Sequence, residues 1–307
     1  LHDSHPGYHC TDWAHRSGSP RLAVSHHHAH VAAALIEHQL LDQPVLGLAF
    51  DGSCWGADGV VWGGEALVAT LDHAERVAHL RPFALPGGEL AIRQPWRVAA
   101  ALLWQIAGPA EWARLCELFL PGGWLALQPL LQRVTPVGWE RPAHRPPVPG
   151  VPLTTSLGRL FDGIASLVMR LPHATFEGEP AQRLESLASF ESEAAYEFPL
   201  TETNPRQFDW RPMLRGIVAD CCGGVPPSRI AARVHQAIAD LCIAWAVQYP
   251  GLPVILSGGC FQNRQLCERI ASVLPSRIHT PGRIPVNDGG LAAGQLAIGM
   301  MRTKLHS

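Results

Sequence analysis

Charge is scarce in this sequence, and the charges that are present nearly cancel. Asp, Glu, Lys and Arg make up 16% of the 307 residues, and the formal net charge is −2. Proteins that hold nucleic acid or an anionic membrane by general electrostatics carry a clear excess of positive charge. The composition leaves room for local patches, but it predicts neither a nucleic-acid partner nor a membrane partner.

Long apolar runs are missing too. The stretch from Leu291 to Met301 is one of the longest, and Gly294, Gln295 and Gly299 interrupt it. A helix that crosses a bilayer needs about 20 consecutive apolar residues, and no signal-peptide pattern is present. Since 47% of the residues are hydrophobic, the chain can bury a full core. We expect a globular protein of the cytoplasm.

Cysteines with the spacing of a zinc or redox motif are also absent. The eight cysteines are Cys10, Cys54, Cys116, Cys221, Cys222, Cys242, Cys260 and Cys267. None forms a Cys-x-x-Cys pair, and adjacent cysteines rarely reach disulfide geometry. Free thiols in a reducing compartment are the expectation.

Helical and strand-like segments alternate along the chain. We expect helices over 21–41, 96–106, 160–171, 184–195, 228–249 and 263–274 and after 290, and strands at 45–50, 60–65 and 253–256. The second strand ends a hairpin, with Glu65 at its tip. Short apolar strands that lead through glycine-rich turns into helices are typical of an α/β protein.

Prolines crowd one region, residues 134–152. They are Pro136, Pro142, Pro146, Pro147, Pro149 and Pro152. So many prolines exclude a helix interior or a central strand. We therefore place a boundary there, with lobe I at residues 1–147, lobe II at residues 148–307, and the C-terminal helix returning to lobe I.

Four histidines fall within five positions, at His26, His27, His28 and His30. On a helix, His26 and His30 share one face and can bind one metal ion. The spacing fits a solvated polar patch equally well. In a metal site, His27 and His28 would point elsewhere and contact substrate or solvent.

Two carboxylates stand at turns where the chain could supply further ligands, Asp51 after one strand and Asp288 before the last helix. Each could equally be a simple turn residue beside glycine. Glycine-rich turns at Asp51-Gly52 and Ser257-Gly258-Gly259 suit phosphate binding through backbone N–H groups. A plain connection between elements is the alternative for both turns.

Nine short motifs follow one another in order. They are Val24 to His30, Asp51 to Gly59, Trp62 to Glu65, Leu85 to Gly88, Pro95 to Arg97, Thr155 to Asp162, Phe176 to Gly178, Leu256 to Asn263 and Asn287 to Gly290. This set, which covers nearly the whole chain, resembles the C-terminal domain of the HypF carbamoyltransferases of nickel–iron hydrogenase maturation. That domain is similar to TsaD, the tRNA threonylcarbamoyl transferase. The resemblance implies the two-lobed actin/Hsp70/sugar-kinase (ASKHA) fold, here without its first strands.

The resemblance also implies roles for individual residues. His26, His30 and Asp288 would bind the metal, with Asp51 as a direct or water-mediated ligand. Asp162 and Glu177 would hold the ribose hydroxyls, and the nucleotide would be lined by Gly52, Gly178, Ser257, Gly258, Gly259 and Asn263. Such ligands suit Zn or Fe(II), with Mg accompanying the nucleotide.

In that family a separate domain makes carbamoyl adenylate from carbamoyl phosphate and ATP. The carbamoyl group then passes to the C-terminal cysteine of HypE, the partner protein, and AMP leaves. The resemblance implies that this chain carries out the transfer step. Since the adenylate-forming domain is not present in this chain, we expect that it does not make carbamoyl adenylate by itself.

Two features depart from the family pattern, and two other functions stay open. Cys54 stands where the family has glycine, and Glu179-Pro180 stands where it has Gln-Ala. A TsaD-like tRNA-modifying enzyme and a non-catalytic nucleotide-binding scaffold are the alternative functions. The low charge disfavours the first, and a sugar kinase would leave the histidine pair unexplained.

Overall fold

The computed structural model describes residues 1–134, 148–189 and 193–305, and the chain forms two compact units. Unit 1 comprises Leu1–His79, Glu202–Gln207 and Cys242–Ser307, and unit 2 comprises Leu80–Thr201 and Phe208–Leu241. The boundary predicted at residues 147 and 148 borders a segment, 135–147, that lies outside the described residues. Because unit 1 is assembled from three segments, a single boundary cannot describe this division.

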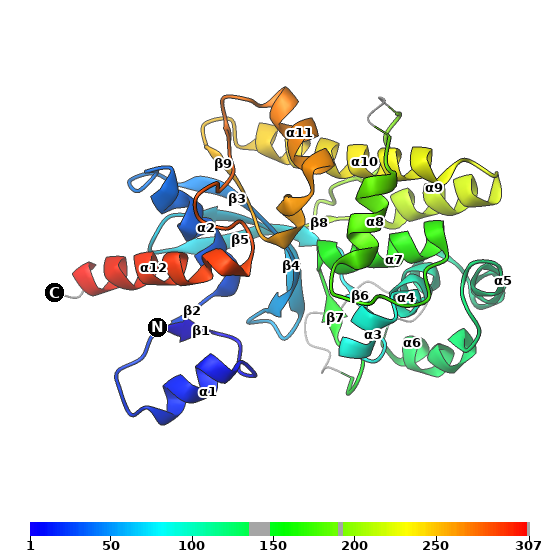
Figure 1. The fold of residues 1–307 in the computed structure, drawn as a ribbon, viewed down its shortest axis with the longest axis horizontal. Helices are drawn as coiled ribbons and strands as arrows, with labels where there is room; N and C mark the ends of the chain where they lie inside the picture. The colour runs from blue at the N-terminus through cyan, green and yellow to red at the C-terminus, as the bar shows by residue number, and fades with distance from the viewer. Residues whose placement is uncertain (135–147, 190–192, 306–307) are drawn as a thin grey trace. The chain divides into compact units, whose positions relative to one another are not determined.

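A mixed β-sheet runs through unit 1 (Figure 1). Six of its eight strands form the main path, which runs in spatial order through β10 (Ile278–His279), β9 (Val254–Ser257), β3 (Val45–Trp55), β4 (Val61–Ala69), β5 (Ala74–Leu80) and β8 (Arg206–Phe208). β9 is parallel to β3, with Ala49 opposite Ser257, whereas β4 is antiparallel to β3. The parallel pairing brings the residues that follow Ala49 and those that follow Ser257 to the same side of the sheet.

Helix α2 (His26–Glu37) is buried from His26 to Leu35 and lies beside α12 (Leu291–Leu305) in Figure 1. A Cβ atom at Gly294 of α12 would lie 1.9 Å from the carbonyl oxygen of Ala29. A Cβ atom at Gly47 of β3 would lie 2.4 Å from the Val31 side chain. Glycine at these two positions lets α2 pack closely against both α12 and the sheet.

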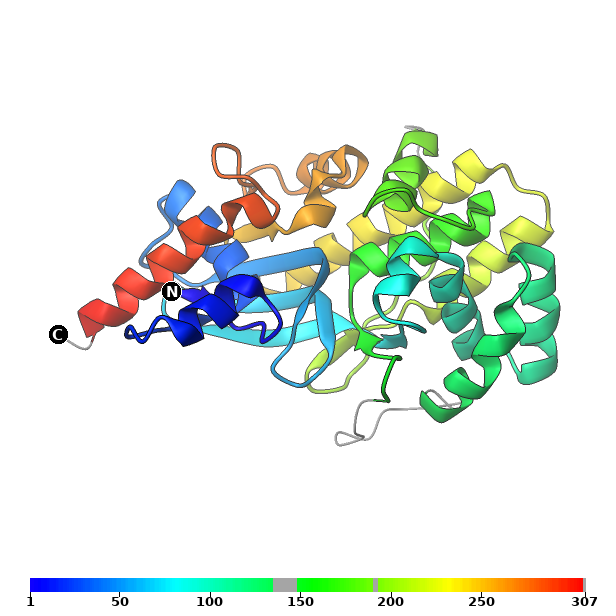
Figure 2. The same cartoon turned by 60° about the horizontal axis from the view of Figure 1, so that its bottom comes forward.

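Two short strands frame the start of the chain. β1 (His2–Asp3) pairs in parallel with β2 (Ala23–Val24), and Asp3 lies opposite Val24. Helix α1 (His9–Arg16) connects them (Figure 2). This pairing places Asp3 close to the first turn of α2.

Unit 2 is mainly helical. Its elements are β6 (Phe83–Ala84), α3 (Glu89–Arg93), α4 (Trp96–Ile106), α5 (Pro109–Phe119), η1 (Trp124–Leu127), α6 (Gln128–Val134), β7 (Leu153–Thr154), α7 (Leu157–Met169), α8 (Glu179–Leu187) and α9 (Arg211–Cys222). A Cβ at Gly163 of α7 would meet Leu102 of α4 at 2.7 Å, so these two helices pack closely.

Helix α10 (Pro227–Gln248) contains residues of both units. By length and composition it could cross a membrane, but 67% of its most apolar window is buried within the protein. Such burial is typical of a core helix in a soluble protein. His235 is fully buried there, and its Nδ1 atom lies 2.8 Å from the Ala231 carbonyl oxygen.

The α/β fold class and most of the predicted elements are confirmed, including α4 and the strand that leads to Ser257. The remaining elements are α11 (Arg264–Val273) and two single-turn helices, η2 (Gly259–Gln262) and η3 (Asp288–Gly290). The bounds of the helix predicted over 184–195 are wrong, because α8 spans Glu179–Leu187 and begins after Gly178, whose φ is positive; residues 190–192 of the predicted range lie outside the described residues. Glu65 is not at a strand tip but inside β4.

Candidate metal centre

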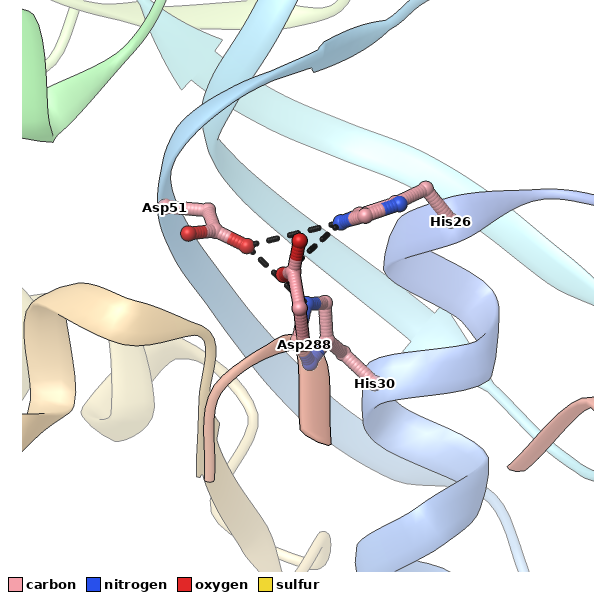
Figure 3. Close-up of side chains that lie close together, drawn as sticks. All are labelled: His26, His30, Asp51 and Asp288. Carbon is pink, nitrogen blue, oxygen red and sulfur yellow. Dashed lines mark ion pairs between the residues drawn. The ribbon is translucent and has the colours of Figure 1, made fainter. Parts of the chain in front are cut away.

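The first turns of α2 carry the two histidines of the candidate site. His26 and His30 lie on one face of the helix and are 2% and 1% exposed. Their Nε2 atoms point toward the same place, where two carboxylates from other segments meet them (Figure 3). A buried imidazole needs a polar partner, and this arrangement supplies one to each ring.

The two carboxylates reach the histidines from separate elements, a strand and a single-turn helix. Asp51 lies in β3, at the irregularity where that strand leaves its register with β4. Asp288 is the first residue of η3, which Asn287 caps through a hydrogen bond from the Gly289 N–H group. The structure therefore brings together residues that lie as far apart in the sequence as His26 and Asp288.

The distances between the four side chains fit a bound metal ion. Each residue offers one ligand atom, and the four atoms lie within 4.8 Å of one another. The Asp288 carboxylate lies 3.5 Å from His26 Nε2 and 3.4 Å from His30 Nε2, and Asp51 lies 3.5 Å from His26. His30 Nε2 lies closer to Asp51 Oδ2, at a hydrogen-bond distance of 2.9 Å, whereas the other three separations are at the long end of hydrogen bonding. Ligands bound at about 2.0–2.2 Å to one tetrahedral ion lie roughly 3.3–3.5 Å apart, close to those three values. Two imidazole nitrogens and two carboxylate oxygens suit Zn or Fe(II).

Electrostatics show how strongly these groups interact. Burial by itself lowers the pKa of His26, but hydrogen bonds with Asp288, Asp3 and Asp51 outweigh burial and raise that pKa to about 11. Burial acts in the same way on His30, whose pKa is raised by Asp288 and Asp51. Hydrogen bonds from the two histidines lower the pKa of Asp288 to about 2. The cluster thus pairs cationic imidazoles with carboxylates, and a metal ion would take the place of their protons.

Asp3 is a functional candidate that the sequence did not reveal. Its Oδ2 atom lies 2.9 Å from His26 Nδ1, and its Oδ1 atom accepts a hydrogen bond from the His5 N–H group. A carboxylate on Nδ1 fixes the proton there and leaves Nε2 free to face the other ligands. The only available signal was an Asp in a turn-rich opening, which no periodicity linked to His26.

His27 and His28 do not reach solvent, so that prediction is wrong. His28 Nε2 lies 2.7 Å from the Thr70 carbonyl oxygen. His27 Nε2 lies 3.2 Å from the Cys54 sulfur, and its Nδ1 lies 3.2 Å from the buried carboxylate of Glu65. Burial lowers the pKa of His27 and raises that of Cys54. Both groups are therefore neutral, and they fill the space behind the metal-facing histidines.

The turn predicted at Asp51-Gly52 is wrong, because both residues lie within β3, which continues to Trp55, whereas Gly258 and Gly259 follow the end of β9 next to the same cluster. Gly258 has a φ of +98°, and a Cβ there would lie 2.3 Å from the Phe50 carbonyl oxygen. The N–H groups of Gly52 and Gly259 donate to Asp51 Oδ1 at 2.7 and 3.3 Å. In the same region, the Ser257 hydroxyl donates to the His30 carbonyl oxygen. Gly52, Ser257 and Gly259 thus help to hold Asp51 and α2 in place.

Asn263, predicted to line the nucleotide, caps α11. Its side-chain oxygen accepts a hydrogen bond of 2.9 Å from the Leu266 N–H group. This contact gives Asn263 a structural role, as is common at helix starts. All eight cysteines are free thiols, as predicted.

The other predicted nucleotide residues lie in unit 2. Asp162, on α7, is 1% exposed and pairs with Arg159 one turn earlier at 3.1 Å. Arg159 also lies 3.2 Å from the exposed carboxylate of Glu177. Burial raises the pKa of Asp162 to about 6 despite the neighbouring guanidinium group. Gly178, with a φ of +83°, precedes α8.

Comparison with known proteins connects this geometry with one family. The model described as "Carbamoyltransferase, Kae1-like Domain, second subdomain" matches residues 47–295, and the model described as "HypF Kae1-like domain" matches residues 1–37. The chain belongs to the HypF carbamoyltransferase family. Its Kae1-like fold is therefore the predicted one.

Several members of the HypF family are similar over nearly the whole chain. Carbamoyltransferase HypF of Synechocystis is 35% identical over 96% of this chain and 39% of its own length. A HypF homolog of Cupriavidus necator is 34% identical over 96% of this chain and 76% of its own length. The chain thus spans about two fifths of the length of the first of these relatives.

Solved HypF structures have the same fold. A crystal structure of full-length HypF in the phosphate- and nucleotide-bound form matches with a TM-score of 0.86 and 33% identity, over 97% of this chain and 46% of that one. HypF of T. kodakarensis matches with a TM-score of 0.82 and 28% identity, over 98% and 40% of the two chains.

Proposed function

We propose that this chain is the carbamoyl-transfer part of a HypF-type protein. In this proposal it passes a carbamoyl group from carbamoyl adenylate to the C-terminal cysteine of HypE, a step toward the cyanide ligands of nickel–iron hydrogenase. The observation that carries the proposal is the four-residue cluster of His26, His30, Asp51 and Asp288 in a chain of the HypF family. The free state of all eight cysteines supports a cytoplasmic location.

The proposed metal ion is Zn or Fe(II), held by the four residues of the cluster. When bound, such an ion acts as a Lewis acid on a carbamoyl or phosphate oxygen. Asp3 orients His26 through Nδ1, and the Gly52 and Gly259 N–H groups orient Asp51. The chain's own residues thus orient His26 and Asp51 before substrate arrives, which limits the reorganisation that binding requires.

Carbamoyl adenylate, ATP or AMP is the proposed nucleotide ligand, with Mg accompanying ATP. Support comes from a solved HypF that holds phosphate and nucleotide. The Glu177 side chain is 63% exposed, so a ligand can reach it, and carboxylate oxygens accept hydrogen bonds from ribose hydroxyls. We assign this contact to Asp162 and Glu177 and the nucleotide lining to Gly52, Gly178, Ser257, Gly258, Gly259 and Asn263.

The nucleophile in this proposal is the thiolate of the partner. Its sulfur attacks the carbamoyl carbon, the bond from that carbon to the phosphate oxygen breaks, and AMP leaves with the bonding electrons. Cys54 is the cysteine beside the cluster, and burial holds its pKa well above the ordinary range. A buried neutral thiol is a poor nucleophile, which supports transfer directly to the partner.

Transfer can be tested with purified chain, synthetic carbamoyl adenylate and a HypE protein. We expect the mass of HypE to rise by one carbamoyl group at its C-terminal cysteine and AMP to be released in equal amount. The matched control is Asp288→Asn, which removes a ligand charge but keeps the size of the side chain. Carbamoyl transfer that is absent with Zn, Fe(II) and Mg, or unchanged in the control, would refute the proposal.

A further inference from the structure

Glu37, the last residue of α2, binds the backbone of a loop that is distant in the sequence, at residues 282–284. Its carboxylate accepts hydrogen bonds from three consecutive backbone N–H groups, those of Gly282 at 2.8 Å, Arg283 at 2.7 Å and Ile284 at 3.0 Å. Burial would raise the pKa of Glu37, but these bonds outweigh it and lower that pKa, so the group is anionic. Hydrogen bonds to an ionised acceptor are roughly twice as strong as those between neutral groups.

The loop that Glu37 binds leads directly to Asp288. Four positions separate Ile284 from Asp288, and the Gly258 N–H group donates to the Val286 carbonyl oxygen at 2.9 Å. His38, next to Glu37, reaches the same loop with its Nε2 atom 3.0 Å from the Thr280 carbonyl oxygen. Hydrogen bonds thus hold the loop at two places ahead of Asp288. Residues 280–284 are bound to the C-terminal end of α2, and Val286 is bound to Gly258, which follows β9.

Asp288 depends on its backbone more than the other three candidate ligands do. Its side chain is 63% exposed, whereas those of His26, His30 and Asp51 are between 1% and 13% exposed. Packing therefore fixes the side chains of the other three candidate ligands, whereas the position of the Asp288 side chain depends on the loop that carries it. The position of the Asp288 carboxylate is set mainly by where residues 282–287 are held.

We propose that Glu37 is a positioning residue for the metal centre and acts through Asp288. A single rigid helix then carries His26 and His30 at one end and, at the other, the anchor of the loop that supplies a further ligand. Glu37 is seven residues beyond His30, or about 10 Å along the helix axis, so it does not touch the ion itself. This inference rests on the metal centre proposed above.

A double-mutant cycle on metal affinity tests this role. The dissociation constant for Zn is measured by competition with a chromophoric chelator in the whole chain, for the unmodified protein, Glu37→Gln, Asp288→Asn and the double variant. Residues that orient metal ligands typically contribute about 10–100-fold in affinity. We expect Glu37→Gln to weaken Zn binding about tenfold, and to have no further effect once Asp288 has been replaced.

The cycle distinguishes a role of Glu37 in positioning Asp288 from a general contribution of Glu37 to the stability of the fold. Asp72→Asn is the matched control, because Asp72 is also an exposed carboxylate of unit 1 with a local hydrogen bond, from Thr70, and it should leave Zn affinity unchanged. Unaltered affinity in both Glu37→Gln and Glu37→Ala would overturn the inference, and so would an equal loss in both backgrounds. If Asp288→Asn alone has no effect, the metal centre itself is misassigned and Glu37 has no ligand to position. Glu37→Ala is measured as well, because a glutamine oxygen still accepts N–H hydrogen bonds whereas alanine removes the acceptor. The melting temperature of each metal-free variant shows whether a lost affinity reflects a general loss of stability.

Discussion

Two carboxylate clusters in this chain have opposite partners. In unit 1, Asp51 and Asp288 face His26 and His30, which can lose their protons. In unit 2, Asp162 and Glu177 face Arg159, which stays charged at any pH a protein experiences. The first cluster can exchange protons for a metal ion, whereas the second already contains a permanent cation. Similar acidic residues thus differ in what they can exchange because of the base placed beside them.

The largest expected effect concerns Arg159. Arg159→Met leaves Asp162 buried without its cation, and removing one partner of a buried pair costs about 3–5 kcal/mol. Chemical denaturation should show that loss in the free energy of unfolding, while the Zn affinity of material that remains folded should not change. Replacing Asp162 by Leu in the same chain should recover much of the stability. A loss near zero would show that Arg159 and Asp162 do not depend on each other.

The converse change is His30→Ala. It removes a direct donor from the cluster in unit 1, so Zn affinity should fall by more than the roughly 100-fold upper range for indirect partners. Elemental analysis of protein purified without added metal provides a second measure. Nucleotide binding by calorimetry should survive, since Asp162 and Glu177 are intact. Metal content equal to that of the unmodified chain would mean that the distances in the cluster do not reflect a metal centre.

The dependence of stability on pH should distinguish the two clusters as well. Burial raises the pKa of Asp162 from 3.8 to about 6 in the folded chain. The stabilising contribution of this group is therefore complete below the unfolded pKa and is lost as pH rises through 6. Its effect on the free energy of unfolding is at most about 1.4 kcal/mol per pH unit. Asp162→Asn should flatten the decline between pH 4 and 6, and parallel profiles for the two proteins would contradict this.

Local pattern predicted the parts of the fold that depend on neighbouring residues. The period of α4 and the apolar run of β9 were visible because packing acts directly on such repeats. The i, i+4 spacing of His26 and His30 was visible for the same reason. Membership of Asp51 and Asp288 in the cluster came from the family resemblance, since no local pattern links these positions.

The interpretation of His27 and His28 failed for a physical reason. A helix with one polar face would have turned them to solvent, but α2 is covered by α12 and by strands β3, β4 and β9 of the sheet. Their partners, Cys54, Glu65 and Thr70, lie on other elements. Contacts of this kind depend on which helix lies beneath which strand, and the local sequence does not encode that.

Asp3 shows the same limit and provides the smallest predicted effect. It reaches His26 only because the two-residue strands β1 and β2 pair in parallel. Asp3→Asn keeps an oxygen that can accept the Nδ1 proton of His26 but removes the negative charge, so Zn affinity should fall by about tenfold, the lower end of the range for such partners. Asp3→Ala, which removes the acceptor as well, should weaken binding further, and Asp12→Asn on the exposed face of α1 is the control. Equal affinity in all three variants would show that His26 is held by helix packing alone, and the contrast between the clusters would then rest on the four direct ligands.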